Sequence, residues 1–269
     1  MVLSIAGFDP SSGAGILADT QTFHNFGQIP FGVLSANTLQ TEDSFERVDW
    51  VEPDFMLSQI SLLLERYPIH YIKIGLIKDF STLLQIAKCV KQTASRSPNK
   101  KEIFLLWDPI LSASAGFSFH DLKSENPQDL NQDLVEALTF IDFVTPNVDE
   151  FKVLEKFLKG SSYIIKSFES DEKTITDLLV IQGILQGESP QKIQKKLLPE
   201  PKNGNSTFQK HGSGCIFSSA LLSNLALGKD LFTSCKVAGE YVFSAMQSSE
   251  TLLSKHFLIR DFKLSEKSS

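Results

Sequence analysis

The stretch VLSIAGFDPSSGAGILADTQTFHNFG, residues 2–27, shows in its first two elements the pattern on which the chain is built. Val2–Ala6 is a short apolar run that stops at Gly7, as buried parallel strands do. A loop of small residues follows, and Gly15–Phe26 then has the apolar spacing of a helix, with Gly27 as its stop signal. A strand, a glycine-rich loop and a helix in this order predict the first unit of an α/β sheet.

The same alternation continues beyond this first unit. Apolar runs predict further strands at Phe31–Ser35, Tyr71–Gly75, Ile103–Trp107 and Phe143–Val144. Helical spacing predicts helices from Pro53 onward and near Leu83–Lys91, Gln132–Leu138 and Asp149–Leu158. Strands separated by helices imply right-handed crossovers, so we expect a mostly parallel central sheet covered by helices on both faces.

The C-terminal part of the chain departs from this alternation. Tyr163–Lys166 and Asp177–Gln182 are joined by a charged connection and predict a hairpin at one edge of the sheet. Residues 186–210 are polar and broken by prolines, which predicts a mobile loop. Two helices near Cys215–Leu227 and Leu231–Gln247 close the chain. Because no internal repeat or linker is present, we expect one domain over residues 1–269.

The composition is that of an ordinary globular protein with a mild negative charge. Of the 269 residues, 42% are hydrophobic and 22% are charged, which allows a sizeable core. The 26 Lys and Arg against 32 Asp and Glu give a net charge of −6. Nucleic-acid-binding proteins normally present a basic face, so this balance argues against that class.

The cysteines and the N-terminus indicate a cytoplasmic protein. Cys89, Cys215 and Cys235 are too few and too scattered for a disulfide framework, and no Cys/His cluster has zinc spacing. The start MVLSIAGFDP lacks the basic residues and the long apolar stretch of a signal peptide. No run of about 18 apolar residues occurs, so we expect no membrane span.

Glycines and polar side chains follow the predicted strands, where open α/β sheets bind their ligands. These segments are Gly7–Gly15, Asn37–Glu42, Gly75, Asp108–Pro109 and Thr145–Glu150. The first is neither a Walker A loop nor a GxGxxG fingerprint. Taken alone, it fits a plain tight turn as well as a ligand-binding loop.

The segment HGSGC, residues 211–215, carries a stronger signal. Gly212 and Gly214 precede an apolar helix, and the unpaired N–H groups and dipole of a helix start stabilise negative charge. The segment therefore predicts an anion hole suited to phosphoryl transfer. The same position predicts a depressed pKa for Cys215. The alternative is a cysteine buried for packing alone.

Two carboxylates that follow strands, Asp108 and Glu150, predict a Mg²⁺ site, because hard oxygen ligands suit this ion. An alternative exists for the second: Asn147 caps a helix and Glu150 completes a capping box. The two interpretations are compatible.

Five segments stand in a specific order: AGFDPSSGAG, KIGLI, DPIL, TPNVDE and HGSGC. This set resembles the hydroxymethylpyrimidine/phosphomethylpyrimidine kinases of thiamine biosynthesis, members of the ribokinase-like superfamily, which write AGSDxSGGAG, KIGM, DPVM, TPNxxE and HGTGC. The resemblance covers roughly residues 4–245. It implies a three-layer α/β/α domain, a homodimer, and phosphorylation of 4-amino-5-hydroxymethyl-2-methylpyrimidine and its monophosphate with ATP and Mg²⁺.

The resemblance also implies residue roles. Cys215 would be the general base that takes the proton of the substrate hydroxyl, and Gly212, Ser213 and Gly214 would form the anion hole. The substrate side would comprise Gln40, Gly7, Asp19 and Leu76. The nucleotide side would comprise Lys166 and Asn147, with Asp108 and Glu150 at the metal.

Several positions depart from the family pattern. Ser12 replaces a glycine, Phe8 replaces a serine, Ser114 stands where a lysine is usual, and the family's KGGH is KSFE at Lys166–Glu169. The helix expected before that last segment is nearly absent. These changes predict a remodelled ATP side. Two alternatives to the pyrimidine kinase follow: a pyridoxal-type kinase, whose substrate also carries a hydroxymethyl group, and a non-catalytic relative that only binds a pyrimidine.

Overall fold

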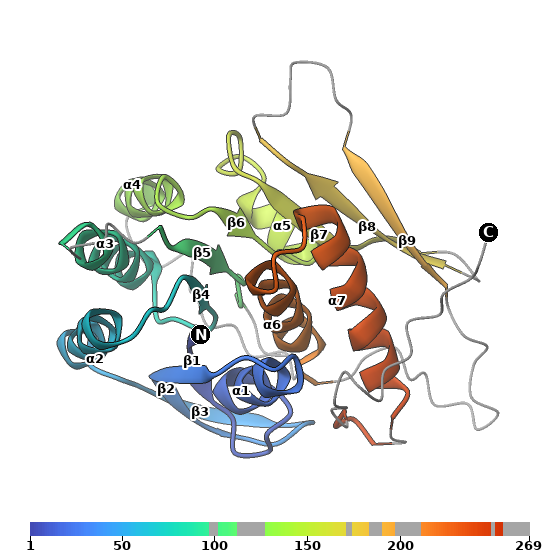
Figure 1. The fold of residues 1–269 in the computed structure, drawn as a ribbon, viewed down its shortest axis with the longest axis horizontal. Coiled ribbons are helices and arrows are strands. Elements are labelled where there is room, and N and C mark those ends of the chain that lie inside the picture. The colour runs from blue at the N-terminus through green and yellow to red at the C-terminus, as the bar shows by residue number, and fades with distance from the viewer. Residues whose placement is uncertain are drawn as a thin grey trace.

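The computed structural model describes residues 1–96, 102–111, 127–170, 174–182, 190–196, 211–248 and 251–254. In this part of the chain a nine-stranded sheet has the order β3-β2-β1-β4-β5-β6-β7-β8-β9. Helices cover both of its faces (Figure 1). The predicted three-layer α/β/α architecture is confirmed.

Most strands and helices lie close to the predicted ranges, some of them longer and others shorter at their ends. The strands are β1 (Val2–Phe8), β2 (Pro30–Gln40), β3 (Phe45–Trp50), β4 (Tyr71–Ile74), β5 (Phe104–Trp107), β6 (Phe143–Val144), β7 (Tyr163–Ser170), β8 (Thr174–Val180) and β9 (Gln191–Lys196). The helices are α1 (Gly15–Asn25), α2 (Pro53–Arg66), α3 (Phe80–Arg96), α4 (Pro127–Leu138), α5 (Val148–Leu154), α6 (Ser213–Ala226) and α7 (Leu231–Met246).

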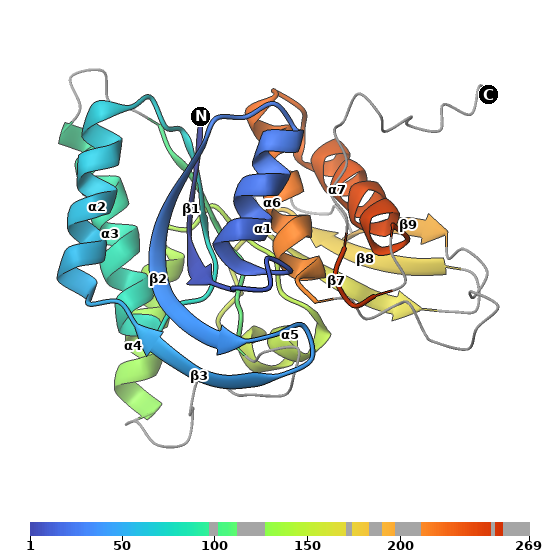
Figure 2. The same cartoon turned by 90° about the horizontal axis from the view of Figure 1, so that it is seen from below.

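Two buried apolar clusters hold the helices against the sheet. One joins α2, α3, α4 and α5 to one face, with Ile60, Leu83 and Leu134 among its buried residues. The other joins α1, α6 and α7 to the opposite face, with Phe23 and Leu221 among its buried residues. Figure 2 shows the second group of helices side by side. None of the helices in the described residues is long and apolar enough to cross a membrane.

Two edge strands differ from the sequence predictions. The strand β3 pairs antiparallel with β2, and charged residues interrupt the apolar ones in its sequence FERVDW. The strand β9 pairs antiparallel with β8 and reads QKIQKK. Edge strands of this kind carry no continuous apolar run, so the search for such runs missed them. The loop prediction for residues 186–210 is wrong at 191–196, and most of the remainder lies outside the described residues.

The predicted hairpin is confirmed, because β7 and β8 pair antiparallel. The predicted helix near Asp149–Leu158 is shorter, since α5 ends at Leu154. The strands β2, β1, β4, β5, β6 and β7 are parallel, so their carboxyl ends share one edge of the sheet. The chain leaves β1 for β2 on one side and later returns to β4 on the other. This reversal makes the end of β1 the topological switch point, where such sheets bind ligands.

Candidate active site

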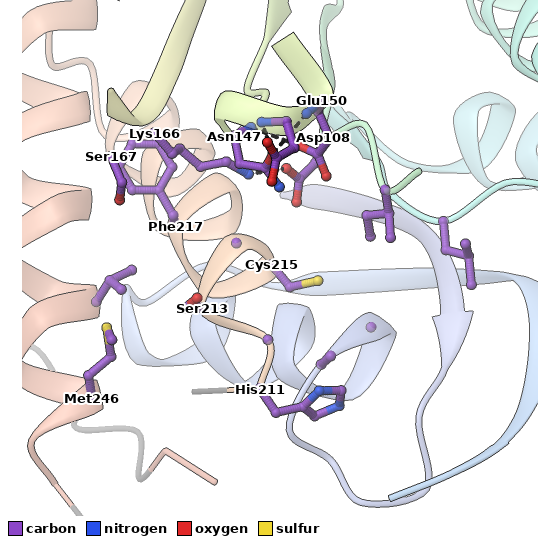
Figure 3. Close-up of a pocket in the computed structure, with 18 of the residues that line it drawn as sticks. Asp108, Asn147, Glu150, Lys166, Ser167, His211, Ser213, Cys215, Phe217 and Met246 are labelled. Carbon is purple, nitrogen blue, oxygen red and sulfur yellow. Dashed lines mark hydrogen bonds and ion pairs between the residues drawn. The ribbon is translucent and has the colours of Figure 1, made fainter. Parts of the chain in front are cut away.

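A cavity of about 680 Å³ opens at the carboxyl ends of the parallel strands. All but one of the predicted site residues line it: Gly7, Gln40, Leu76, Asp108, Asn147, Glu150, Lys166, Gly212, Ser213, Gly214 and Cys215. Figure 3 shows Cys215 between the group of Asp108, Asn147, Glu150 and Lys166 on one side and His211 on the other. The exception is Asp19, which is fully buried outside the cavity wall.

Two glycine loops form the floor of the cavity by packing directly on each other. Gly212 has φ +75°, and a Cβ on it would lie 1.8 Å from the carbonyl oxygen of Gly13. Gly15 has φ +61°, and its Cβ would lie 2.2 Å from the carbonyl oxygen of Gly7. A side chain fits at neither position, and the absence of one lets the HGSGC segment rest on the loop after β1.

A hydrogen bond between buried side chains ties these loops together. His211 Nε2 lies 2.7 Å from Asp9 Oδ2. The Asp9 carboxylate also accepts hydrogen bonds from the backbone N–H groups of Ser11 and Ala14, at 2.9 and 2.8 Å. Burial alone would raise the pKa of Asp9, but His211 and the Ser11 and Ala14 donors outweigh it and hold the pKa below its usual value. Asp9 therefore organises one loop and anchors the other. Sequence analysis gave neither residue a role.

We expect Gly212→Ala to destabilise the fold well beyond the cost of a left-handed backbone. Gly27 is the matched control, because it has φ +73° and an added Cβ would meet nothing within 4 Å. Gly27→Ala should cost about 1 kcal/mol, whereas Gly212→Ala should cost at least ~3 kcal/mol, since loop backbone must move. Urea unfolding of both variants measures the difference. Equal losses would show that the two loops do not pack as described.

Asp19 anchors a buried lysine instead of contacting the cavity, which corrects its predicted role. Its carboxylate accepts hydrogen bonds from Ser4 Oγ and Lys73 Nζ at 2.5 Å each and from Ser219 Oγ at 2.8 Å. These partners come from β1, β4 and α6. The carboxylate therefore joins three elements behind the site, where a substrate does not reach it.

Lys73 belongs to the segment KIGLI and has no predicted role of its own. It is fully buried, and its Nζ lies 2.5 Å from Asp19 Oδ1 and 3.8 Å from Asp108 Oδ2. Burial favours its neutral form, but the charges of Asp19 and Asp108 outweigh this and raise its pKa. A lysine within the apolar strand YIKI must find a partner, and that signal was available in the sequence.

Asp108 accepts hydrogen bonds on both carboxylate oxygens. Thr145 Oγ1 and Lys166 Nζ each lie 2.8 Å from its Oδ1, and Ser218 Oγ lies 2.9 Å from its Oδ2. Burial alone would raise the pKa of Asp108, but Lys166 and Lys73 hold it below the usual value. Asp108 is therefore an ionised carboxylate at the cavity wall.

Glu150 has the predicted capping-box geometry, and its role at Mg²⁺ stays a prediction. It completes a capping box, since its Oε2 accepts from the Asn147 N–H at 2.7 Å and Asn147 Oδ1 accepts from the Glu150 N–H at 2.9 Å. It also lines the cavity. Burial raises the pKa of Glu150 to about 7, with Lys166 opposing the rise and Asp108 adding to it.

Asp108 and Glu150 suit a Mg²⁺ ion that binds together with substrate phosphates. They do not by themselves form a complete coordination shell. No cluster of three or more His, Cys, Asp or Glu side chains occurs in the described part of the chain. Mg²⁺ commonly binds through one or two carboxylates, with the remaining ligands supplied by substrate phosphates and water. Asp108 and Glu150 meet that requirement.

The pKa prediction for Cys215 is wrong in direction. The side chain is 6% exposed, and burial raises the pKa of its thiol to about 11. The positive charge of Lys73 opposes the rise, while Asp19 and Asp108 add to it. The helix start and Lys73 do not compensate for the loss of water around the sulfur. Cys215 is a protonated thiol at neutral pH.

If Cys215 takes the substrate proton, kcat/KM should rise with pH. Below a pKa of about 11, the thiolate fraction increases about tenfold per pH unit, so we expect this slope between about pH 7 and about pH 9. Ionisation of Glu150 near pH 7 should steepen the rise at its lower end. Initial rates across this range check the prediction. A plateau in kcat/KM above about pH 8 would contradict it.

Two serines adopt the left-handed backbone conformation at positions where the related kinases have glycine. Ser12 has φ 63° and Ser167 has φ 54°, and no other non-glycine in the described residues has positive φ. The backbone N–H of Ser167 donates to Asp177 Oδ1 at 2.9 Å. Lys166, the residue before Ser167, lines the cavity. Ser114 lies outside the described residues, and Phe8 ends β1.

One side of the cavity is lined by apolar residues. It is formed by Ile175 of β8, Phe217 of α6 and the α7 residues Gly239, Val242, Phe243 and Met246. Figure 3 labels two members of this wall, Phe217 and Met246, which lie on the same side of Cys215 as Ser167. Sequence analysis did not identify it, because its members belong to helices and strands with ordinary apolar spacing.

Known proteins share this sequence pattern and this architecture. The hydroxymethylpyrimidine/phosphomethylpyrimidine kinase of Aquifex aeolicus is 31% identical over 275 residues, covering 97% of this chain and 100% of that protein. The pyridoxal kinase of Bacillus subtilis, solved as an ADP complex, has a TM-score of 0.71 at 22% identity, over 96% of this chain and 98% of that one. A phosphomethylpyrimidine kinase from Clostridium difficile 630 has a TM-score of 0.65 at 24% identity, over 91% and 98%. These two structures show the shared fold. The sequence model of the phosphomethylpyrimidine kinases matches residues 9–260, and the chain belongs to this family of phosphotransferases.

Proposed function

We propose that this protein transfers the γ-phosphoryl group of ATP to the hydroxymethyl oxygen of 4-amino-5-hydroxymethyl-2-methylpyrimidine, and then phosphorylates the resulting monophosphate. The observation that carries the proposal is the position of Cys215 at the start of α6, in one cavity with the substrate-side and phosphate-side residues. Gly7, Gln40 and Leu76 line that cavity together with Asp108, Glu150 and Lys166. The family membership and the Aquifex aeolicus relative support the same activity.

The chain's own groups account for the transfer. The hydroxyl oxygen attacks the γ-phosphorus, the bond from that phosphorus to the bridging oxygen of ADP breaks, and the hydroxyl proton passes to the thiolate form of Cys215, which becomes a thiol. The backbone N–H groups of Gly212, Ser213 and Gly214 at the start of α6 donate to the oxygens of the transferred group. Lys166 supplies a positive charge beside them, since a Cβ on Gly214 would lie 3.2 Å from its Nζ.

Asp108 and Glu150 would hold a Mg²⁺ that reduces the negative charge of the nucleotide phosphates. The apolar wall of Phe217, Val242 and Met246 suits the flat face of the adenine, because purine rings bind between apolar side chains. This assignment places the nucleotide between α7 and β8.

The proposal is tested with purified protein, Mg-ATP and the hydroxymethylpyrimidine, with mono- and diphosphate products resolved by anion-exchange chromatography. We expect both products, formed one after the other. Pyridoxal, offered at the same concentration, is the competing alcohol, and a preference for it would overturn the proposed substrate. Absence of any product on either alcohol would favour a protein that only binds a pyrimidine.

A homodimer and a cytoplasmic location are further proposals that rest on the family resemblance. Light scattering after size-exclusion chromatography tests the dimer, and a monomeric mass at micromolar concentration would overturn it. Cell fractionation tests the location.

A further inference from the structure

The ammonium group of Lys166 lies between the carboxylates of the cavity and the start of α6. Its Nζ donates to Asp108 Oδ1 at 2.8 Å. A Cβ added to Gly214 would lie 3.2 Å from the same Nζ, so the ammonium also adjoins the first turn of the helix. The charge of Glu150 acts on Lys166 as well, and Figure 3 shows both carboxylates beside this lysine. The side chain is 13% exposed and lines the cavity.

The Lys166 contact completes the set of partners around Asp108. Thr145 and Ser218 donate to the two carboxylate oxygens, and Lys73 lies 3.8 Å from Oδ2. Lys73 cannot move toward the cavity freely, because it also binds Asp19 at 2.5 Å. Of the two lysines, only Lys166 stands on the cavity side.

The charges of this group cancel. The buried carboxylates Asp19 and Asp108 face the two ammonium groups of Lys73 and Lys166, so these four groups together carry no net charge. The carboxylate of Glu150 also acts on Lys166 and lies outside this balance. A divalent cation approaching Asp108 therefore meets a carboxylate whose charge is already balanced, with the Lys166 ammonium on the cavity side. At short range in a partly buried site, like charges repel strongly.

We propose that Lys166 acts as an internal counter-ion that occupies the place of a divalent cation at Asp108 and keeps free metal from binding before the nucleotide. Nucleotide phosphates that reach the start of α6 meet the ammonium there and draw it from the carboxylate. Asp108 and Glu150 then become available to the metal that the phosphates carry. The role of the nucleotide rests on the proposed function, whereas the exclusion of free metal does not.

The test is a titration of the nucleotide-free protein with Mn²⁺, in which electron paramagnetic resonance measures the free ion. Wild-type protein should bind Mn²⁺ weakly. Lys166→Met removes the charge and should bind Mn²⁺ about 10- to 100-fold more tightly, because a unit positive charge beside the ion is lost. Adding Asp108→Asn to this variant should abolish the gain.

Two controls separate the local effect from a general change in charge. Lys192→Met also removes one positive charge, but Lys192 is exposed and pairs with Glu169 outside the cavity wall. This variant should bind Mn²⁺ like the wild type. Lys166→Arg retains the positive charge and should also behave like the wild type. Lys166→Gln gives the same comparison should Lys166→Met lose its circular dichroism spectrum.

Each outcome decides the proposal without reference to kinase activity. Equal Mn²⁺ affinity in wild type and Lys166→Met would overturn it. Tighter Mn²⁺ binding by the wild type than by Lys166→Met would also overturn it. A gain that survives Asp108→Asn would overturn it as well, because the metal would then bind elsewhere. A protein that shows the expected metal pattern but phosphorylates neither alcohol would lose the proposed function and keep this inference.

Discussion

Replacing Cys215 with alanine should lower kcat for pyrimidine phosphorylation about 10²- to 10⁴-fold, the range that a positioned general base contributes. Cys215 lies in the first turn of α6, beside the donors of the anion hole, and lines the cavity. Removing its sulfur deletes the proton acceptor and leaves the loops in place. KM for both substrates should therefore change much less than kcat.

Cys235 offers a matched control for this experiment. It is a fully buried cysteine on α7 and lies outside the cavity wall. Cys235→Ala should lose some stability and keep its kcat. Steady-state kinetics on both variants make the comparison. A Cys215→Ala enzyme within about threefold of the wild-type kcat would show that the thiol is not the base.

The raised pKa of Cys215 limits the fraction of enzyme that carries the reactive thiolate. With a pKa of about 11, the thiolate is a minor species at neutral pH. A base of this kind accepts a proton strongly but is rarely in the correct form. Sequence analysis predicted the opposite shift, because it saw the helix start and not the burial. The dipole of a first turn extends over a short distance, whereas the depth of a side chain depends on the whole fold.

The position of the site was predictable because it follows from chain direction alone. Parallel strands end at one edge, so the glycines and polar residues after β1, β4, β5 and β6 had to meet there. This is why Gly7, Asp108 and Glu150 were found without any coordinates, whereas Leu76 was predicted only from the family resemblance. The edge strands β3 and β9 were missed for the converse reason. Each of these strands pairs with only one neighbouring strand and keeps an exposed face, so it lacks the apolar run of a central strand.

The contacts behind the cavity could not be predicted from local sequence. Asp19 was expected at the substrate because the related kinases suggested it, and the structure instead joins it to Lys73. That pair connects residues 54 positions apart and depends on the crossing of α1 over β1 and β4. Spacing in a sequence gives the face of a helix, but it does not give the partner on another element.

Lys73→Met should destabilise the fold by about 3–5 kcal/mol, the range observed when one partner of a buried ion pair is removed. The variant retains the volume of the side chain, so most of the loss comes from the uncompensated charge. Asp19 is fully buried and would keep two hydroxyl donors, Ser4 and Ser219, but no cation within its contacts. Urea unfolding measures the loss.

A surface ion pair supplies the control for this loss of stability. Lys88 pairs with Glu136 at 2.7 Å, with both side chains more than a third exposed, and Lys88→Met should cost less than about 1 kcal/mol.

Adding Asp19→Asn to Lys73→Met should recover part of the stability, because the amide removes the buried negative charge and leaves the hydroxyl contacts possible. If Lys73→Met costs no more than Lys88→Met, the buried charges do not hold β4 to α1 and α6. A large loss with recovery would mean that the charges behind the cavity are balanced within the fold itself. Asp108 would then be the only carboxylate of the buried group whose counter-ion, Lys166, stands where a nucleotide can displace it.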